Sequence, residues 1–392
     1  MSLPSLNITL PNDASQATLV GRIHNPAIQG PSIVTIQDGA VYDITSNQAP
    51  TMRDICEMSN PGTFVKAQQG TMIGSFEELA ANSDENSRDQ SKPYFLSPID
   101  LQVIKASGVT FVVSLLERVI EEQAKGDPQK AAEIREDIDN LIGTDLSKLV
   151  PGSPEAMEIK KKLIEKGVWS QYLEVGIGPD AEIFTKSPVL SSVGTGAHIG
   201  IHPVSNWNNP EPEIALAVST AGKAAGAMLA NDVNLRDVEG RSALLLGKAK
   251  DNNASCALGP FIRLFDQTYT LDDVRACDIN LKVEGLDGFV LDGLNSLSQI
   301  SRDPADLINA TLNENHQYPD GMVLLLGTMF APVKDRDVKG DGFTHKIDDV
   351  VTISAPQLGG LSNRVKYSKD CAPWTYGVSS FMRNLAKRGL LT

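Results

Sequence analysis

The segment NNPEPEIALAVS, residues 208–219, places two glutamates in front of an uninterrupted apolar run. Glu211 and Glu213 are two residues apart, and residues 214–218 follow directly. In an extended strand, residues i and i+2 project from the same face, so both carboxylates would point to one place. Like charges held that close repel each other unless a proton or a cation lies between them. The pair therefore indicates either a solvated strand end or a metal site.

A third carboxylate favours the metal site. Asp232 comes 19 residues after Glu213, at the end of an apolar segment, residues 226–230. This spacing fits one strand out, a turn at residues 220–223 and one antiparallel strand back, which would return Asp232 beside the glutamates. Three carboxylates make an oxygen-rich site for a hard divalent cation, best Mg²⁺, with Mn²⁺ or Ca²⁺ as substitutes. Three protein ligands leave coordination positions for substrate and water, as a catalytic metal requires.

The composition is that of a globular protein and argues against several classes of partner. The 392 residues carry a formal charge of −14, which disfavours nucleic acids and anionic membranes as partners. The four cysteines lie far apart without a CxxC motif, so neither a disulfide framework nor a thiolate zinc site is expected. No stretch approaches about 18 consecutive apolar residues, and the first residues lack the pattern of a secretory signal. We expect a soluble, cytoplasmic protein.

The pattern along the chain predicts an α+β protein that is mainly β. Residues 1–95 contain alternating segments and turn signals, such as the QDG turn at 37–39, and indicate a small N-terminal α+β domain. Residues 96–392 form the predicted catalytic domain, in which the charged segment 108–166 has helical periodicity and is expected to be a lid. Beyond residue 180 we expect a mixed β-roll or barrel-like sandwich. Its predicted strands cover residues 188–193, 199–204, 213–219, 226–233, 256–264, 277–284, 322–327 and 347–354. The short helices predicted between them cover residues 234–246, 270–275 and 303–315.

Other polar residues follow the predicted strands. Lys250 precedes a Cys-Ala-Leu-Gly-Pro turn, and a lysine near a carboxylate cluster could bind a substrate carboxylate or act as a base. An exposed lysine on a loop is the alternative. Gly327 and Thr328 end an apolar strand, where backbone N–H groups could hold an anion, although Gly-Thr at a strand end is also common.

Several motifs occur in a fixed order, and as a set they resemble the catalytic domain of the fumarylacetoacetate hydrolase superfamily. They are EPE at 211–213, NDVNLRD at 231–237, Lys250 ahead of ALGP, GT at 327–328 and IDDVVTISAPQLGGLSNRV at 347–365. The resemblance covers roughly residues 95–392 and implies a mixed β-roll of the fumarylacetoacetase C-terminal type. It assigns Mg²⁺ or a similar ion to Glu211, Glu213 and Asp232, catalysis to Arg236 and Lys250, and substrate binding to Lys250, Gly327 and Thr328.

The chain departs from many C–C hydrolases and decarboxylases of that superfamily in its lid. Those enzymes carry a histidine–glutamate pair on a lid helix that activates water. The matching stretch here is GVTFVVSLLERVIEE, residues 108–122, in which Ser114 stands in the place of the histidine and Glu117 keeps the acidic position. None of the five histidines is an obvious substitute. We expect Ser114 to contact the substrate and Glu117 to act as an acid–base group.

The same superfamily contains dehydratases of 2-keto-3-deoxy sugar acids, which need no nucleophilic water, and this chain is most similar to their pentonate branch. The resemblance implies a Mg²⁺-dependent carbon–oxygen lyase. Its substrate would be 2-keto-3-deoxy-D-arabinonate, also called 2-keto-3-deoxy-D-xylonate, and its product 2-oxoglutarate semialdehyde, in oxidative pentose catabolism. Hydrolysis of a 2,4-diketo sugar acid or an acylpyruvate is the alternative. The C3 base would be Glu117 or Lys250, and a homodimer or homotetramer is expected.

Overall fold

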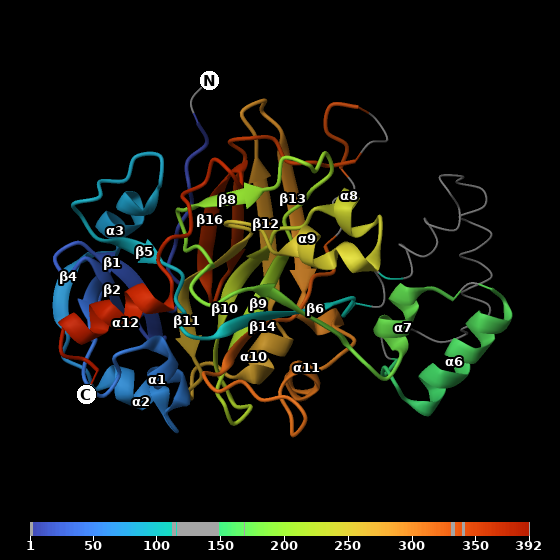
Figure 1. Cartoon of the computed structure of the whole chain (residues 1–392), viewed down its shortest axis with the longest axis horizontal. Coiled ribbons are helices and arrows are strands. Elements are labelled where there is room, and N and C mark those ends of the chain that lie inside the picture. The colour runs from blue at the N-terminus through green and yellow to red at the C-terminus, as the bar shows by residue number, and fades with distance from the viewer. Residues whose placement is uncertain are drawn as a thin grey trace.

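Two β-sheets dominate the computed structural model of the chain, which describes residues 3–111, 115, 149–167, 169–330, 334–338 and 342–391 (Figure 1). The larger sheet has the order β4-β3-β2-β1-β11-β10-β9-β14-β6-β7, and β5 pairs with β1 beside this path. The smaller sheet has the order β13-β12-β15-β16-β8. Pairing is antiparallel except between β14 and β6 and between β16 and β8, so both sheets are mixed. The predicted fold class, α+β and mainly β with a mixed roll, is confirmed.

The strand bounds follow the chain from the N-terminal region into the body. The larger sheet contains β1 (Leu19–Asn25), β2 (Gly30–Gln37), β3 (Ala40–Asp43), β4 (Thr71–Ser75), β5 (Tyr94–Leu96), β6 (Val103–Gly108), β7 (Glu182–Ser187), β9 (Pro212–Val218), β10 (Ala224–Asp232), β11 (Cys256–Leu264) and β14 (Met322–Leu325). The smaller sheet contains β8 (His198–Ile201), β12 (Asp278–Glu284), β13 (Val290–Ser296), β15 (Val350–Ala355) and β16 (Gly359–Tyr367).

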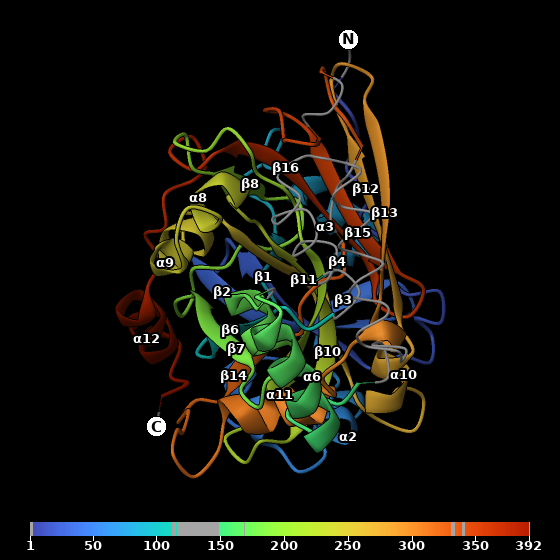
Figure 2. The ribbon, with the colours of Figure 1, turned by 90° about the vertical axis from the view of Figure 1, so that its right-hand side faces the viewer.

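Short helices surround the sheets. The α-helices are α1 (Met52–Glu57), α2 (Pro61–Lys66), α3 (Phe76–Ser83), α6 (Pro154–Glu165), α7 (Gln171–Ile177), α8 (Arg236–Glu239), α9 (Leu246–Lys250), α10 (Leu271–Arg275), α11 (Pro304–Thr311) and α12 (Val378–Lys387). Two 3₁₀ turns, η2 (Ala243–Leu245) and η3 (Leu297–Gln299), complete the set. Helices α6 and α7 lie at the end of the molecule remote from β1–β4 (Figure 1), and in the view from that end α6 lies in front (Figure 2). No helix in the described part of the chain has the length and apolarity needed to cross a bilayer.

Strand β9 shows why the body needs two apolar layers. Its residues alternate between two clusters: Ile214 and Leu216 belong to the core between the sheets, whereas Ala215 and Ala217 belong to a second core on the other face. The first core also contains residues of β12 and β15, and the second contains Met52 of α1. A strand buried on both faces reads as a continuous apolar run, as seen in the sequence.

The N-terminal residues extend the larger sheet. Strand β1 pairs with β11 of the body, with Leu19 opposite Arg263 and Val20 opposite Ile262. The hydrogen-bonded sheet therefore crosses the domain boundary expected near residue 95, and the division into domains 1–95 and 96–392 stays a prediction. Within this part, the predicted QDG hairpin is confirmed, because Asp38 and Gly39 both have positive φ, 49° and 78°, between β2 and β3.

The prediction of a strand at residues 188–193 is wrong, because the strand in this region lies earlier in the chain. The strand is β7, which ends at Ser187, and Pro188 follows it. Proline has no N–H to donate to a neighbouring strand, so the ladder stops there. The helix predicted at 234–246 is also shorter than expected, because α8 ends at Glu239 and only a 3₁₀ turn follows before α9.

Candidate functional site: a buried carboxylate cluster

The three predicted metal ligands lie together at one end of the β9–β10 pair. In this antiparallel register Glu213 is opposite Ala230, and the Asp232 N–H donates to the Glu211 carbonyl oxygen at 3.1 Å. The predicted antiparallel return of the chain is therefore confirmed. One carboxylate oxygen from each residue lies within 4.8 Å of the others, and all three side chains are buried.

The electrostatics of the cluster favour a cation. Burial, with repulsion from Asp232 and Glu211, raises the pKa of Glu213 well above its usual value. Burial also raises the pKa of Glu211, although Lys250 opposes the shift. Burial alone would raise the pKa of Asp232, but Lys186 and Lys250 hold it below its usual value. Three buried carboxylates that resist joint ionisation form an all-oxygen donor set, which fits a hard divalent ion such as Mg²⁺.

Two buried lysines complete the cluster. The Lys250 ammonium lies 2.5 Å from Glu211 Oε2 and 3.1 Å from Asp232 Oδ2. The Lys186 ammonium lies 2.6 Å from Asp232 Oδ1 and donates to the Val233 carbonyl oxygen at 3.0 Å. Sequence reasoning missed Lys186, because a lysine at the end of a strand next to proline usually points to solvent. The prediction that Lys250 lies near the carboxylates is confirmed.

A cavity opens onto this cluster. It is lined by Ser107, Gly108, Val109, Leu115, Tyr172, Glu182, Phe184, Glu211, Glu213, Asp232, Glu239, Lys250, Gly327 and Thr328. The predicted residues Gly327 and Thr328 are thus part of its wall. Val109 and Leu115 add apolar residues to the same lining.

Gly327 is required by the geometry of the cavity wall. Its N–H donates to Glu213 Oε2 at 2.7 Å, and its φ is +90°, a conformation that residues with a side chain rarely adopt. A Cβ atom at this position would also lie 2.2 Å from Thr110 Oγ1. The backbone can therefore approach Glu213 only because residue 327 is glycine.

A second group of polar residues orients Glu211. The Asn234 amide donates to Glu211 Oε1 at 3.1 Å and to Glu239 Oε2 at 2.6 Å. Glu239 and Glu182 add two more carboxyl groups to the cavity lining. Neither glutamate was predicted. Glu239 is the last residue of the short helix α8 and lies two residues after the NDVNLRD motif, so its proximity to the motif is the only signal that the sequence offers.

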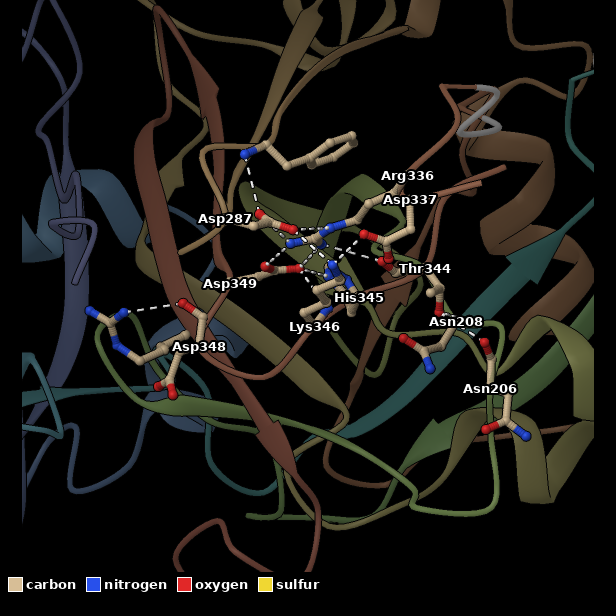
Figure 3. A network of polar contacts seen from close by, with 12 residues as sticks. Asn206, Asn208, Asp287, Arg336, Asp337, Thr344, His345, Lys346, Asp348 and Asp349 are labelled. Atoms are coloured by element: carbon tan, nitrogen blue, oxygen red, sulfur yellow. Dashed lines mark hydrogen bonds and ion pairs between the residues drawn. The ribbon is translucent and has the colours of Figure 1, made fainter. Parts of the chain in front are cut away.

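An ion network fixes the segment that continues from the Gly327–Thr328 wall (Figure 3). The buried Arg336 guanidinium contacts both carboxylate oxygens of Asp349, at 2.6 and 2.8 Å, and both of Asp287, at 3.0 and 3.2 Å. Asp287 lies between β12 and β13, and Asp349 directly precedes β15. Lys346 adds contacts to Asp287 at 2.9 Å and to Asp337 at 2.6 Å.

The same network reaches the segment that carries the first glutamate. Thr344 Oγ1 accepts a hydrogen bond from the Asn208 N–H at 3.3 Å and donates to the Asn206 carbonyl oxygen at 3.2 Å (Figure 3). Asn208 is three residues before Glu211. The loop after β14 and the approach to β9 are thus held against each other at the side of the cluster.

Comparison with known protein families agrees with this geometry. The sequence profile of the fumarylacetoacetate (FAA) hydrolase C-terminal family matches residues 174–366, a range that contains the whole carboxylate cluster and both lysines. Residues 174–366 form an FAA hydrolase C-terminal domain.

Two curated relatives of this chain have named activities. The chain is 30% identical to a 2-dehydro-3-deoxy-D-arabinonate dehydratase of Saccharolobus solfataricus over 47% of this chain. That match spans 58% of the relative's length, which is less than two thirds. The chain is 24% identical to a probable 2-keto-3-deoxyxylonate dehydratase of Haloferax volcanii over 87% of this chain and 98% of the relative.

Solved structures show the same fold. A 2-keto-3-deoxy-D-arabinonate dehydratase in complex with magnesium and 2,5-dioxopentanoate superimposes with a TM-score of 0.61 at 21% identity. Its apo form superimposes with a TM-score of 0.61 at 22% identity. Each comparison covers 89% of this chain and 99% of the other.

Of the remaining predicted residues, the structure describes only Arg236. Arg236 lies in α8 with its guanidinium 4.5 Å from the Trp207 ring centroid, and it is not among the described residues that line the cavity. Ser114 and Glu117 lie outside the described residues, as does most of the predicted lid. The neighbouring Leu115 does line the cavity. The roles of Arg236, Ser114 and Glu117 stay predictions.

Proposed function

We propose that the chain is a Mg²⁺-dependent dehydratase that converts 2-keto-3-deoxy-D-arabinonate, which is the same compound as 2-keto-3-deoxy-D-xylonate, to 2,5-dioxopentanoate. The observation that carries this proposal is the buried cluster of Glu211, Glu213 and Asp232 with Lys250 at the end of a small cavity. The named activities of the two curated relatives and of the magnesium-bound dehydratase structure support the same substrate class.

The metal would be held by the three carboxylates. When bound, Mg²⁺ supplies Lewis-acid polarisation of the substrate's C2 ketone, which makes the C3 protons more acidic. Dehydration removes one C3 proton and the C4 hydroxyl as water, and the double bond then moves to C4–C5 to give an enol that becomes the C5 aldehyde. The chain must therefore place a base near C3 and an acid near the C4 hydroxyl.

Lys250 is better suited to hold a proton than to accept one. Burial alone would lower its pKa, but Asp232 and Glu211 raise the pKa of Lys250 well above its usual value. We therefore propose Glu117 as the C3 base and Lys250 as a cation that stabilises negative charge on the substrate. The Gly327–Thr328 wall is the proposed position of the substrate's carboxylate, with Ser114 as a further substrate contact and Arg236 as a residue near the substrate.

Product analysis tests the proposed function. Purified protein with Mg²⁺ is incubated separately with 2-keto-3-deoxy-D-arabinonate and with an acylpyruvate. We expect 2,5-dioxopentanoate from the first compound and no pyruvate from the second. Pyruvate from the acylpyruvate, with no turnover of the sugar acid, would contradict the dehydratase and establish the alternative hydrolase.

Three finer properties belong to the same proposal. Magnesium is proposed as the native ion, with manganese or calcium as substitutes in the same oxygen-rich site. A homodimer or homotetramer is proposed for the assembly, to be measured by light scattering. A cytoplasmic location is the third and rests on the sequence expectation alone.

A further inference from the structure

A second cavity lies away from the carboxylate cluster. It has a volume of about 330 Å³ and is formed by β1, β5, the segment 190–197 and the residues that precede α12. It shares no lining residue with the cavity at the metal site. Pockets for small organic ligands occupy about 300–1,000 Å³, so this one can take a small molecule.

Arg22 provides a buried cation at this cavity. Its side chain is 5% exposed, and its guanidinium donates through Nη1 to the carbonyl oxygens of Ser97 and Ile99. Its Nε lies 4.0 Å from Asp100, beyond hydrogen-bond distance. Among the described residues, the guanidinium makes no hydrogen bond through Nε or Nη2. Arg22 thus retains donors for a ligand.

Three further polar groups surround the same space. In the described part of the chain, the Tyr376 hydroxyl and the Arg88 Nε are buried atoms without a hydrogen-bond partner. The Arg88 guanidinium lies 4.1 Å from the Tyr94 ring centroid. The His24 ring, which also lines the cavity, stacks against Tyr94, its partner across the β1–β5 pair, with 5.0 Å between the ring centroids. Buried polar atoms are normally satisfied, so unsatisfied donors gathered around one cavity indicate an absent acceptor.

The acidic groups near the cavity are already engaged. Glu85, the one carboxylate in the lining, accepts from the His198 N–H at 2.8 Å, and its other oxygen lies 3.4 Å from His198 Nδ1. Asp100 behind Arg22 accepts from the backbone N–H groups of Met52 and Arg53, at 2.6 and 3.1 Å. The uncommitted polar groups of the cavity are therefore donors, and two of them are cationic.

The rest of the lining is apolar. Leu96, Leu190, Val193 and Pro31 belong to the lining. A ligand that complements both the hydrogen-bond donors and the apolar lining of this cavity needs an anionic or acceptor group and an apolar body. Inorganic anions lack the apolar body, and hydrocarbons lack the acceptor.

We propose that this cavity is a binding site for a small organic carboxylate with an apolar body, separate from the metal site. The carboxylate would accept from Arg22, Arg88 and the Tyr376 hydroxyl, and the body would lie against Leu96 and Leu190. This inference does not depend on the proposed dehydratase activity.

Calorimetric titration of the 392-residue chain in the presence of Mg²⁺ tests the proposal, with benzoate as the probe and benzyl alcohol as its neutral counterpart. Benzoate should bind with one equivalent per chain, and benzyl alcohol should bind at least about tenfold more weakly, because it cannot form charge-assisted hydrogen bonds. Equal affinity for the two compounds, or no saturable benzoate binding up to about 10 mM, would overturn the proposal.

Variants separate this cavity from the metal site. Ala372→Trp places a large side chain at the cavity lining and should abolish benzoate binding, whereas the matched change Ala386→Trp, on the exposed face of α12, should leave it unchanged. Tyr376→Phe should weaken binding about fivefold, the value of one hydrogen bond. Glu213→Gln should leave benzoate binding intact. Loss of binding in Glu213→Gln with retention in Ala372→Trp would assign benzoate to the metal site and refute the proposal.

Discussion

At the level of single residues, Lys250 is the cation that contacts two of the three carboxylates. Its ammonium lies between Glu211 and Asp232, so it lowers the negative charge available to a metal ion while offering a cation to the substrate. We predict that Lys250→Met lowers turnover by about 10²–10⁴-fold, because a charge-stabilising group is lost. The affinity for Mg²⁺ should increase, because a competing positive charge is removed.

Steady-state kinetics and calorimetry measure the two effects of this substitution. Lys248→Met is the matched control, because Lys248 is exposed and its ammonium lies 3.3 Å from His202 rather than at the cluster. Near-normal turnover in Lys250→Met, or a loss of Mg²⁺ affinity equal to that of a ligand substitution, would contradict the role given to Lys250.

At the same scale, Gly327 connects backbone conformation to the cluster. We predict that Gly327→Ala lowers the free energy of unfolding by about 3 kcal/mol or more, because it adds a clash with Thr110 to the strain of a positive φ. Gly288→Ala has a similar φ, +80°, but no atom within 4 Å of the new Cβ, so it should cost only about 1 kcal/mol. Equal losses for the two variants in denaturant unfolding would show that the contact with Thr110 is unimportant.

At the level of elements, Arg336 joins the loop after β14 to the β12–β13 turn and to the start of β15. We predict that Arg336→Met destabilises the protein by about 3–5 kcal/mol at neutral pH, because the buried Asp349 carboxylate loses the guanidinium that contacts both of its oxygens. Arg275→Met is the matched control: Arg275 also contacts both oxygens of one carboxylate, Asp303, but its side chain is 36% exposed, so the loss should be below about 1 kcal/mol.

The effect of Arg336 depends on pH in a defined direction. Burial would raise the pKa of Asp349, but hydrogen bonds from His345 and Arg336 hold it below its usual value. The Arg336 guanidinium likewise lowers the pKa of Asp287. A lowered pKa in the folded state gives stability that is present above the unfolded-state pKa, about 3.9, and is lost as the pH falls below it. The difference between wild type and Arg336→Met should therefore decrease below about pH 4, and a constant difference across that range would contradict this assignment.

At the level of the whole molecule, the N-terminal strands and the FAA hydrolase domain share one sheet and one core. The second apolar cluster combines Val20 and Met52 with Ala215, Met228 and Leu258. We predict a single cooperative urea transition, with coincident curves from far-ultraviolet circular dichroism and from fluorescence of the three tryptophans, all of which follow residue 95. A separate N-terminal transition in circular dichroism alone would contradict this prediction and support independent folding of residues 1–95.

The sequence was sufficient to predict the carboxylate cluster but not its surroundings. Glu211, Glu213 and Asp232 depend on local rules, namely the two-residue period of a strand and the length of one hairpin. Lys186 depends on the pairing of β7 with β6, a contact between distant segments that no local pattern specifies. The residues that line the cavity likewise come from segments far apart in the sequence, so no local pattern specifies them.

Strand β16 shows a second limit of the sequence. It was not predicted, because Ser362, Asn363 and Arg364 interrupt its apolar pattern, yet all three are buried. The Asn363 amide donates to the carbonyl oxygens of Gly194 and Ala197, both at 2.9 Å, and Arg364 donates to the Pro4 carbonyl oxygen at 2.9 Å. From the sequence alone, polar residues such as these are predicted to be exposed. Their hydrogen-bond partners lie in loops far away in the chain and are known only from the fold.

The central claim is that Glu211, Glu213 and Asp232 hold the ion on which dehydration depends. Its most direct test is the rate of 2,5-dioxopentanoate formation from 2-keto-3-deoxy-D-arabinonate after removal of metal with EDTA and readdition of Mg²⁺. It is measured in wild type and in Asp232→Ala, with circular dichroism confirming that the variant is folded. The wild type should lose activity with EDTA and regain it with Mg²⁺, whereas Asp232→Ala should stay inactive at Mg²⁺ concentrations that saturate the wild type. Turnover by Asp232→Ala without added metal, or full wild-type activity in EDTA, would contradict the claim.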